Sequence, residues 1–162
     1  MFLLIYLFSL TALSRSASKG RDQSLYPTLY VDCRVDGKFC GKCCHDTRMP
    51  LTESDIKRIK RLGFAEEYFV DRRGRIPKLK NVDGHCVFLD PDTNSCMIYP
   101  DRPEGCRLYP LVYDEECDKV VVDDLCPKSR TIPQRLVKEL SSALISLIDK
   151  LYEESSKRRK EF

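Results

Sequence analysis

Several features that identify common protein classes are missing from this sequence. It contains no tryptophan, and its seven glycines form neither a phosphate-binding loop nor a dinucleotide-binding fingerprint. Its charge is nearly balanced, with 28 basic and 25 acidic side chains, so composition gives no support for nucleic-acid binding. No nucleophile–base pair or pair of catalytic carboxylates stands out. The sequence therefore predicts no nucleic-acid partner and no clear small-molecule substrate, which leaves an unidentified protein as the remaining class of partner.

A long hydrophobic segment is also missing. The apolar run from Phe2 to Leu13 has the length of a signal-peptide core and falls short of the ~20 residues of a membrane-spanning helix. No basic residue precedes this run, although a secretory signal normally has one. We therefore expect residues 1–30 to be a poorly ordered leader, or the product of a start site placed too far upstream. The expected compartment is the cytoplasm, and the alternative is a secreted or N-terminally anchored protein.

The sequence after this leader predicts a small, loop-rich α+β domain with short strands over residues 31–128. Thr52, with Asp55 three positions later, is a favourable start for a helix, and Gly63 is a favourable end. The Asp83–Gly84 dipeptide indicates a hairpin turn between two extended segments. The domain is thus predicted to alternate short elements with many turns.

Two further segments differ from this pattern. After Thr131, apolar residues recur at helical spacing for more than four turns, which predicts a long amphipathic helix within residues 129–162. This helix is expected to pack on the domain or on a partner chain. The segment from Cys33 to Cys44 is polar and irregular, and we predict that it is a loop.

The nine cysteines are the most informative residues of the chain. Four of them lie within twelve positions, in the segment C-R-V-D-G-K-F-C-G-K-C-C at 33–44, and Cys86, Cys96 and Cys106 follow at intervals of ten. Thiolates gathered this closely repel one another and are readily oxidised. They must therefore be held by a metal ion, an iron–sulfur cluster or disulfides.

The sequence supports these three alternatives unequally. Disulfides are disfavoured because the cysteine count is odd and because Cys43 and Cys44 are adjacent. Zinc fits the C-x-x-C pair of Cys40 and Cys43, although a second short-range pair is missing; His45 and His85 each adjoin a cysteine and offer imidazole ligands. An iron–sulfur cluster takes four thiolates, often as a close group plus a remote one, and the chain has enough thiols for two such sites.

Several motifs of this chain together resemble one protein family. They are C-G-K-C-C at 40–44, L-T-E-S-D-I at 51–56, G-H-C-V-F-L at 84–89, C-M-I-Y-P-D-R-P-E-G-C-R-L-Y-P at 96–110 and C-P at 126–127. The family is the YkgJ type of cysteine-cluster proteins, which is described as chelating zinc or iron and is often labelled an Fe–S-cluster oxidoreductase. The resemblance covers about 33–127, and the segment 96–110 is its most specific part.

The resemblance implies a metal-binding protein whose metal is an iron–sulfur cluster of the 4Fe–4S type with a possible redox role. The alternative is a zinc-stabilised, non-enzymatic module that binds another protein. Eight cysteines are the candidate metal ligands: Cys33, Cys40, Cys43, Cys44, Cys86, Cys96, Cys106 and Cys126. Cys33 departs from the family's C-x-x-C-x-x-C-C opening because six residues separate it from Cys40, so a looser loop would have to deliver it.

Overall fold

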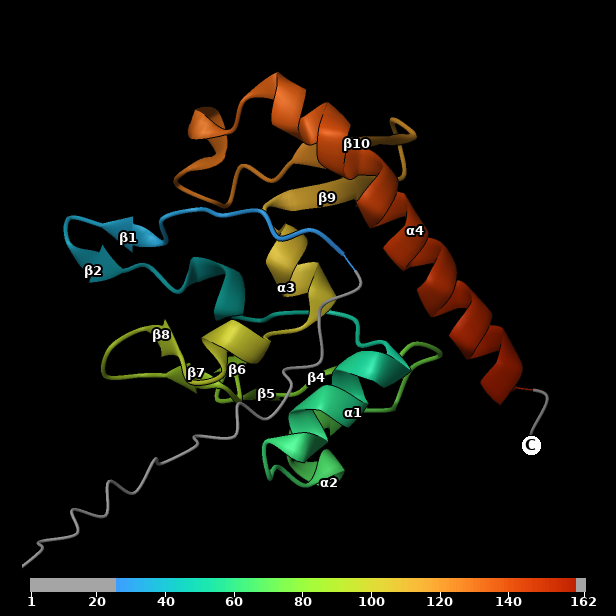
Figure 1. Ribbon diagram of the computed structural model, residues 1–162. Coiled ribbons are helices and arrows are strands. Elements are labelled where there is room, and N and C mark those ends of the chain that lie inside the picture. The colour runs from blue at the N-terminus through green and yellow to red at the C-terminus, as the bar shows by residue number, and fades with distance from the viewer. Residues whose placement is uncertain (1–25, 160–162) are drawn as a thin grey trace, which may run out of the picture.

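The computed structural model describes residues 26–159 and shows short antiparallel strand pairs combined with helices (Figure 1). The predicted α+β class, with a long C-terminal helix, is confirmed. The helices are α1 (Glu53–Arg61), α2 (Glu66–Phe69), α3 (Glu104–Leu108) and α4 (Gln134–Arg158). The strands are β1 (Arg34–Val35), β2 (Lys38–Phe39), β3 (Val70–Asp71), β4 (Lys78–Leu79), β5 (Asn81–Val82), β6 (His85–Cys86), β7 (Leu89–Asp90), β8 (Ser95–Cys96), β9 (Leu111–Asp114) and β10 (Lys119–Val122). Most of the predicted leader lies outside the described residues.

Every sheet in residues 26–159 is a two-stranded antiparallel pair: β1–β2, β3–β4, β5–β6, β7–β8 and β9–β10. The hairpin predicted at Asp83–Gly84 joins β5 to β6. The segment 33–44 is not the loop that we predicted, because β1 and β2 form a hairpin there. Asp36 and Gly37 turn this hairpin with positive φ angles of 50° and 77°, as the tightest hairpin turns require.

Helix α1 begins where the sequence predicts, and its first residues explain why. The Thr52 side chain accepts a hydrogen bond from the Asp55 backbone N–H, and the Asp55 carboxylate accepts one from the Thr52 backbone N–H. This reciprocal capping satisfies two backbone donors that a helix start otherwise leaves unpaired. Both residues are fully buried, so the cap lies inside the fold.

Two hydrophobic cores stabilise the fold, one on each side of the segment that carries α3. The first core joins α1 and α2 to β3, β4, β6 and β7, and its fully buried aromatic residues are Phe69 and Phe88. The second core is formed by the inner face of α4 against β9, β10 and the end of α3. The arrangement places α4 along one side of the molecule, with α1 toward its lower end, α2 below α1, and the β1–β2 hairpin projecting at the opposite side (Figure 1).

The long helix α4 has the amphipathic pattern that the sequence predicts. Val137, Leu140, Leu144, Leu147 and Leu151 are buried at a spacing of three or four residues. Burial of each leucine contributes roughly 1.5–3 kcal/mol, which is how so long a helix is held on two short strands. No helix in the described part of the chain is long and apolar enough to cross a membrane.

Candidate metal centre

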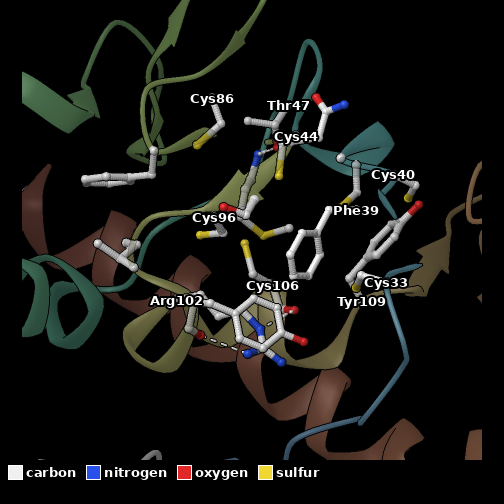
Figure 2. A pocket seen from close by; sticks show the side chains of 18 of the residues that line it. Cys33, Phe39, Cys40, Cys44, Thr47, Cys86, Cys96, Arg102, Cys106 and Tyr109 are labelled. Atoms are coloured by element: carbon white, nitrogen blue, oxygen red, sulfur yellow. Dashed lines mark hydrogen bonds between the residues drawn. The ribbon is translucent and has the colours of Figure 1, made fainter. Parts of the chain in front are cut away.

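Seven of the nine cysteines line a single cavity of about 550 Å³. They are Cys33, Cys40, Cys43, Cys44, Cys86, Cys96 and Cys106. Figure 2 shows the cysteine side chains entering this cavity from several loops and from α3. All nine cysteines are free thiols. The structure thus brings together seven of the eight residues that the sequence predicts as ligands, and their role as ligands stays a prediction.

The remaining two cysteines differ from each other in position. Cys126 is half-buried and does not line the cavity, but its thiol interacts electrostatically with those of Cys40 and Cys43. Cys117 is exposed on the turn between β9 and β10, where its backbone N–H donates to the Asp114 carboxylate. Cys126 therefore belongs to the edge of the cysteine cluster, and Cys117 does not belong to it.

Short local structures deliver the first four thiols. Cys33 and Cys40 flank the β1–β2 hairpin, and the Cys40 backbone N–H donates to the Cys33 carbonyl at 3.0 Å. Cys43 and Cys44 lie on a 3-10 turn, Lys42–Cys44, which follows Gly41 in the left-handed conformation at φ 58°. A side chain at Gly41 would be strained there and would press on Asn94, whose Cβ is 3.2 Å from the position of an added Cβ.

The other cavity-lining thiols come from two strand ends and one helix. Cys86 ends β6, Cys96 ends β8, and Cys106 lies in the middle of α3. The Met97 backbone N–H donates to the Phe88 carbonyl at 2.9 Å, which extends the β7–β8 pair and fixes Cys96 beside the first core. In Figure 2 the thiols of Cys44, Cys86 and Cys106 point toward a common region.

The thiols are spread around the cavity and do not converge on the position of one metal ion. No three Cys, His, Asp or Glu side chains within residues 26–159 are placed so that they could hold one metal ion. Four thiolates on a single zinc ion, with Zn–S distances of about 2.3 Å, would have their sulfurs within roughly 4 Å of one another. The cavity-lining thiols therefore stand wider apart than the ligands of one mononuclear site.

Burial controls the acidity of most of these thiols. It raises the pKa of Cys86 to about 11 and that of Cys106 well above its ordinary value, because a thiolate loses its hydration inside the fold. Burial also raises the pKa values of Cys33, Cys96 and Cys126. Without a cation, these side chains stay protonated at neutral pH.

Cys43 is the exception to this rule. A hydrogen bond from the neighbouring Cys44 thiol lowers the pKa of Cys43, and the nearby Arg102 guanidinium lowers it further. The same hydrogen bond, together with burial, raises the pKa of Cys44. Cys43 is thus the first of the clustered thiols to ionise.

Arg102 is a buried cation whose charge acts on the thiols of the cavity. It is 8% exposed, its guanidinium lies 4.0 Å from the Tyr99 ring centroid, and it donates to the carbonyls of Tyr99 and Cys106. Its charge also lowers the pKa of Cys96, although burial outweighs this effect. A buried arginine held in this way offsets negative charge that gathers on thiolates in the cavity.

A buried ionic network positions α3 behind the cavity. Asp55 accepts hydrogen bonds from Arg58 at 2.6 Å and from the Glu104 backbone N–H at 3.0 Å, and Arg58 also donates to Glu104 at 3.3 Å. The side chains of all three residues are almost fully buried. The network joins the start of α1 to the start of α3, two residues before Cys106. Sequence reasoning identified Asp55 as a helix cap but missed Arg58 and Glu104.

The two histidines do not join the thiols. His45 and His85 form an isolated β-bridge with each other, and their ring centroids are 6.3 Å apart. Neither side chain lines the cavity. The sulfur groups that line this cavity are therefore the seven thiols and the Met49 thioether, and no imidazole joins them.

Comparisons with known proteins agree with this thiol-rich site. Residues 32–127 match the model of the CxxCxxCC family, which is described as a putative zinc- or iron-chelating domain. The chain is also similar to an uncharacterized protein, MJ0661, of Methanocaldococcus jannaschii, with 39% identity over 77 residues. This alignment covers 44% of the present chain and 41% of the relative. No solved structure matches the chain.

Proposed function

Because the chain belongs to the CxxCxxCC family of zinc- or iron-chelating domains, we propose that its clustered cysteines hold an iron–sulfur cluster of the 4Fe–4S type. Metal chelation is the property that the family description gives, and the kind of metal group is our proposal. The observation that carries it is the cavity lined by seven thiols, which has no preformed site for a single ion.

The donor set fits such a cluster. A 4Fe–4S cluster is held by four cysteine thiolates and occupies more space than one ion, so its ligands stand wider apart than those of zinc. The cavity of about 550 Å³ has thiols on several of its walls, where a larger group can reach them. A single zinc ion would require several loops to close inward.

The surroundings of the thiols also fit. Apolar side chains, including Leu79, Phe88 and Ile98, form part of the cavity wall. Four thiolates and a cluster together carry net negative charge, and the buried guanidinium of Arg102 offsets part of that charge. The protein thereby combines a partly apolar wall with a fixed positive group, and both kinds of surroundings tune cluster potentials.

A bound cluster supplies one-electron transfer, and a redox role follows from that chemistry. The chain's own residues provide thiolates, hold them in position and limit the access of solvent. No arrangement of side chains within residues 26–159 specifies a substrate, so we assign no reaction beyond electron transfer.

The test is the content of iron and acid-labile sulfide in the full-length protein, purified without oxygen, together with its visible spectrum. We expect about four iron and four sulfide per chain and absorption near 400 nm that dithionite bleaches. Cys86→Ser should remove most of this iron and sulfide, whereas Cys117→Ser, at an exposed position outside the cavity, should leave both unchanged.

Zinc without sulfide in the wild-type protein would refute this proposal. It would favour the alternative of a zinc-stabilised module, and the search would then turn to a protein partner. Unchanged iron and sulfide in Cys86→Ser would show that the ligand assignment is wrong.

A further inference from the structure

We propose that Cys33 and Cys40 form a redox-active dithiol, which closes to a reversible disulfide across the β1–β2 hairpin. Cys33 directly precedes β1, and Cys40 directly follows β2. A cluster takes four thiolates and the chain has eight candidate ligands, so there are thiols to spare for other chemistry. The thiol–disulfide reaction itself requires no metal group.

The backbone pairing of the hairpin places the two cysteines opposite each other. In the β1–β2 register, Arg34 pairs with Phe39, so Cys33 and Cys40 occupy the next opposed positions. The Cys40 N–H donates to the Cys33 carbonyl at 3.0 Å, which confirms this opposition. Opposed residues joined in this way have Cα atoms about 5.5 Å apart and side chains on the same face. Disulfides usually join Cα atoms roughly 4.4–6.8 Å apart, so the backbone already meets this requirement.

The turn of the hairpin maintains this spacing. Asp36 and Gly37 have positive φ angles of 50° and 77°, as the tightest hairpin turns require. The Arg34 guanidinium lies 4.9 Å from the centroid of the Phe39 ring on the other strand, and this cation–π contact stabilises the pair beside the cysteines. The two thiols are therefore held near each other although six residues separate them in the sequence.

The sulfur atoms need only a small movement to meet. In the reduced protein the Cys33 thiol donates to the Val31 carbonyl at 3.6 Å, and it leaves this carbonyl as the disulfide forms. The Cβ atoms of opposed residues are about 4.5–5.5 Å apart, slightly wider than the roughly 3.5–4.5 Å of a relaxed disulfide. Both strands are exposed and belong to neither hydrophobic core, so they can shift. A disulfide closed with some strain is readily reduced, which suits a reversible role.

Accessibility distinguishes this pair from another pair of opposed cysteines. Cys44 and Cys86 occupy opposed positions next to the isolated β-bridge between the two histidines. Cys86, however, is 4% exposed and belongs to the first core, so a dissolved oxidant cannot reach it. Cys33 and Cys40 are both half-buried and lie beside exposed strands. A dissolved disulfide therefore reaches the hairpin pair first.

Cys43 is close to Cys40 in the sequence but has a different partner. Its thiol accepts a hydrogen bond from the Cys44 thiol in the reduced protein. A disulfide between these adjacent residues would close a strained small ring. Cys43 therefore competes poorly for Cys40 and pairs poorly with Cys44.

The oxidation is a two-electron exchange with a low-molecular-weight disulfide such as glutathione disulfide. The thiolate of one cysteine attacks a sulfur of the small disulfide, forms a mixed disulfide and expels one thiolate. The other cysteine, also as a thiolate, attacks the protein sulfur of the mixed disulfide and expels the second thiolate. The two cysteines lose two protons and two electrons, and the small disulfide becomes two thiols. Excess reduced thiol reverses both steps.

The test uses full-length protein, purified without oxygen and equilibrated in glutathione buffers of increasing oxidation. Alkylation, proteolysis and mass spectrometry then identify which cysteines are paired. We expect the Cys33–Cys40 disulfide to form first and to disappear in a reducing buffer. Cys117→Ser, at an exposed position outside the cavity, should form it at the same glutathione ratio as the wild type. A different first pair would overturn the proposal, as would alkylation of both Cys33 and Cys40 in the most oxidising buffer.

Single substitutions test the mechanism with little risk to the fold, because the hairpin lies outside both cores. Cys33→Ser leaves Cys40 without its partner, so glutathione should stay attached to Cys40 as the mixed disulfide. Gly37→Val strains the turn without a clash, because no atom lies within 4 Å of an added Cβ. It should lower the equilibrium constant for the disulfide by about tenfold, and an unchanged constant would contradict the role of the hairpin.

Iron and sulfide are measured on the same samples, which separates this proposal from the proposed function. Protein that forms the Cys33–Cys40 disulfide but contains no iron or sulfide would refute the cluster and support the dithiol. Protein that contains the cluster but never pairs these two cysteines would refute the dithiol and support the cluster.

Discussion

Replacement of Asp55 by alanine should strongly destabilise the protein and weaken its metal site. The Asp55 carboxylate accepts four hydrogen bonds, from the Thr52 hydroxyl and backbone N–H, from Arg58 and from the Glu104 N–H. It is fully buried. The substitution therefore removes a helix cap and the partner of a buried cation in one step.

The magnitude follows from these losses. Loss of a helix cap costs about 1 kcal/mol, and removal of one partner from a buried ion pair costs about 3–5 kcal/mol. Arg58 retains Glu104 at 3.3 Å, which reduces the second cost. We therefore expect a decrease of about 3 kcal/mol in the free energy of unfolding. Because the network fixes the start of α3, metal content should fall as well through displacement of Cys106.

Urea unfolding followed by circular dichroism measures the change, with metal content measured on the same samples. Asp71→Ala is the matched control, because Asp71 pairs with Arg73 at 2.6 Å on the surface, where such a pair contributes about 1 kcal/mol or less. The double variant Asp55→Ala/Arg58→Met should be less destabilised than the sum of its single variants, because it leaves no unpaired cation at Arg58. If Asp55→Ala costs no more than Asp71→Ala, the network does not have the role that we assign to it.

Three further predictions concern other parts of the structure. Leu147→Ala on the buried face of α4 should lower the free energy of unfolding by about 2–5 kcal/mol, as measured by urea unfolding. The control Ile145→Ala, on the outer face where the side chain is 36% exposed, should lower it much less. Ionisation of Cys86 alone should cost metal-free protein up to about 2.7 kcal/mol of stability between pH 9 and 11, because the Cys86 pKa is raised from 9.0 to about 11 in the fold and the buried thiol resists ionisation. A flat pH profile in thermal unfolding would contradict this. Gly41→Ala should strain the turn that carries Cys43 and Cys44 and reduce metal content measurably, and wild-type metal content in this variant would show that the turn adapts.

Local signals in the sequence predicted the elements that local interactions determine. Helix α1 has its cap within four residues of its start, and α4 repeats its apolar pattern over many turns, so both were predictable from the sequence. The β1–β2 hairpin was missed although Asp36–Gly37 is a hairpin signal. The two-residue strands beside this turn are exposed and lack the alternating pattern that identifies a strand.

In the candidate site, too, the residues that local motifs mark were predictable and those that depend on distant contacts were not. The cysteine motifs predicted the residues of the cavity because thiols at short spacing are visible in the sequence. The ionic network was not predictable, because Arg58 and Glu104 lie 46 positions apart and meet only in the folded chain. Charged residues are seldom fully buried unless they are paired, so a sequence alone suggests that Arg58 and Glu104 lie on the surface.

The placement of Cys106 and Cys126 has a consequence for the order in which the protein matures. Both residues belong to the set of cysteines that we propose as ligands, so this set is complete only after the ribosome has released most of the domain. In the proposed site, a metal group held by Cys44, Cys86 and Cys106 would close long loops and so remove conformational freedom from the unfolded chain, as a cross-link does. Such a metal group would therefore bind late in synthesis and folding. Until it binds, the thiols of the nascent chain are exposed to oxidation.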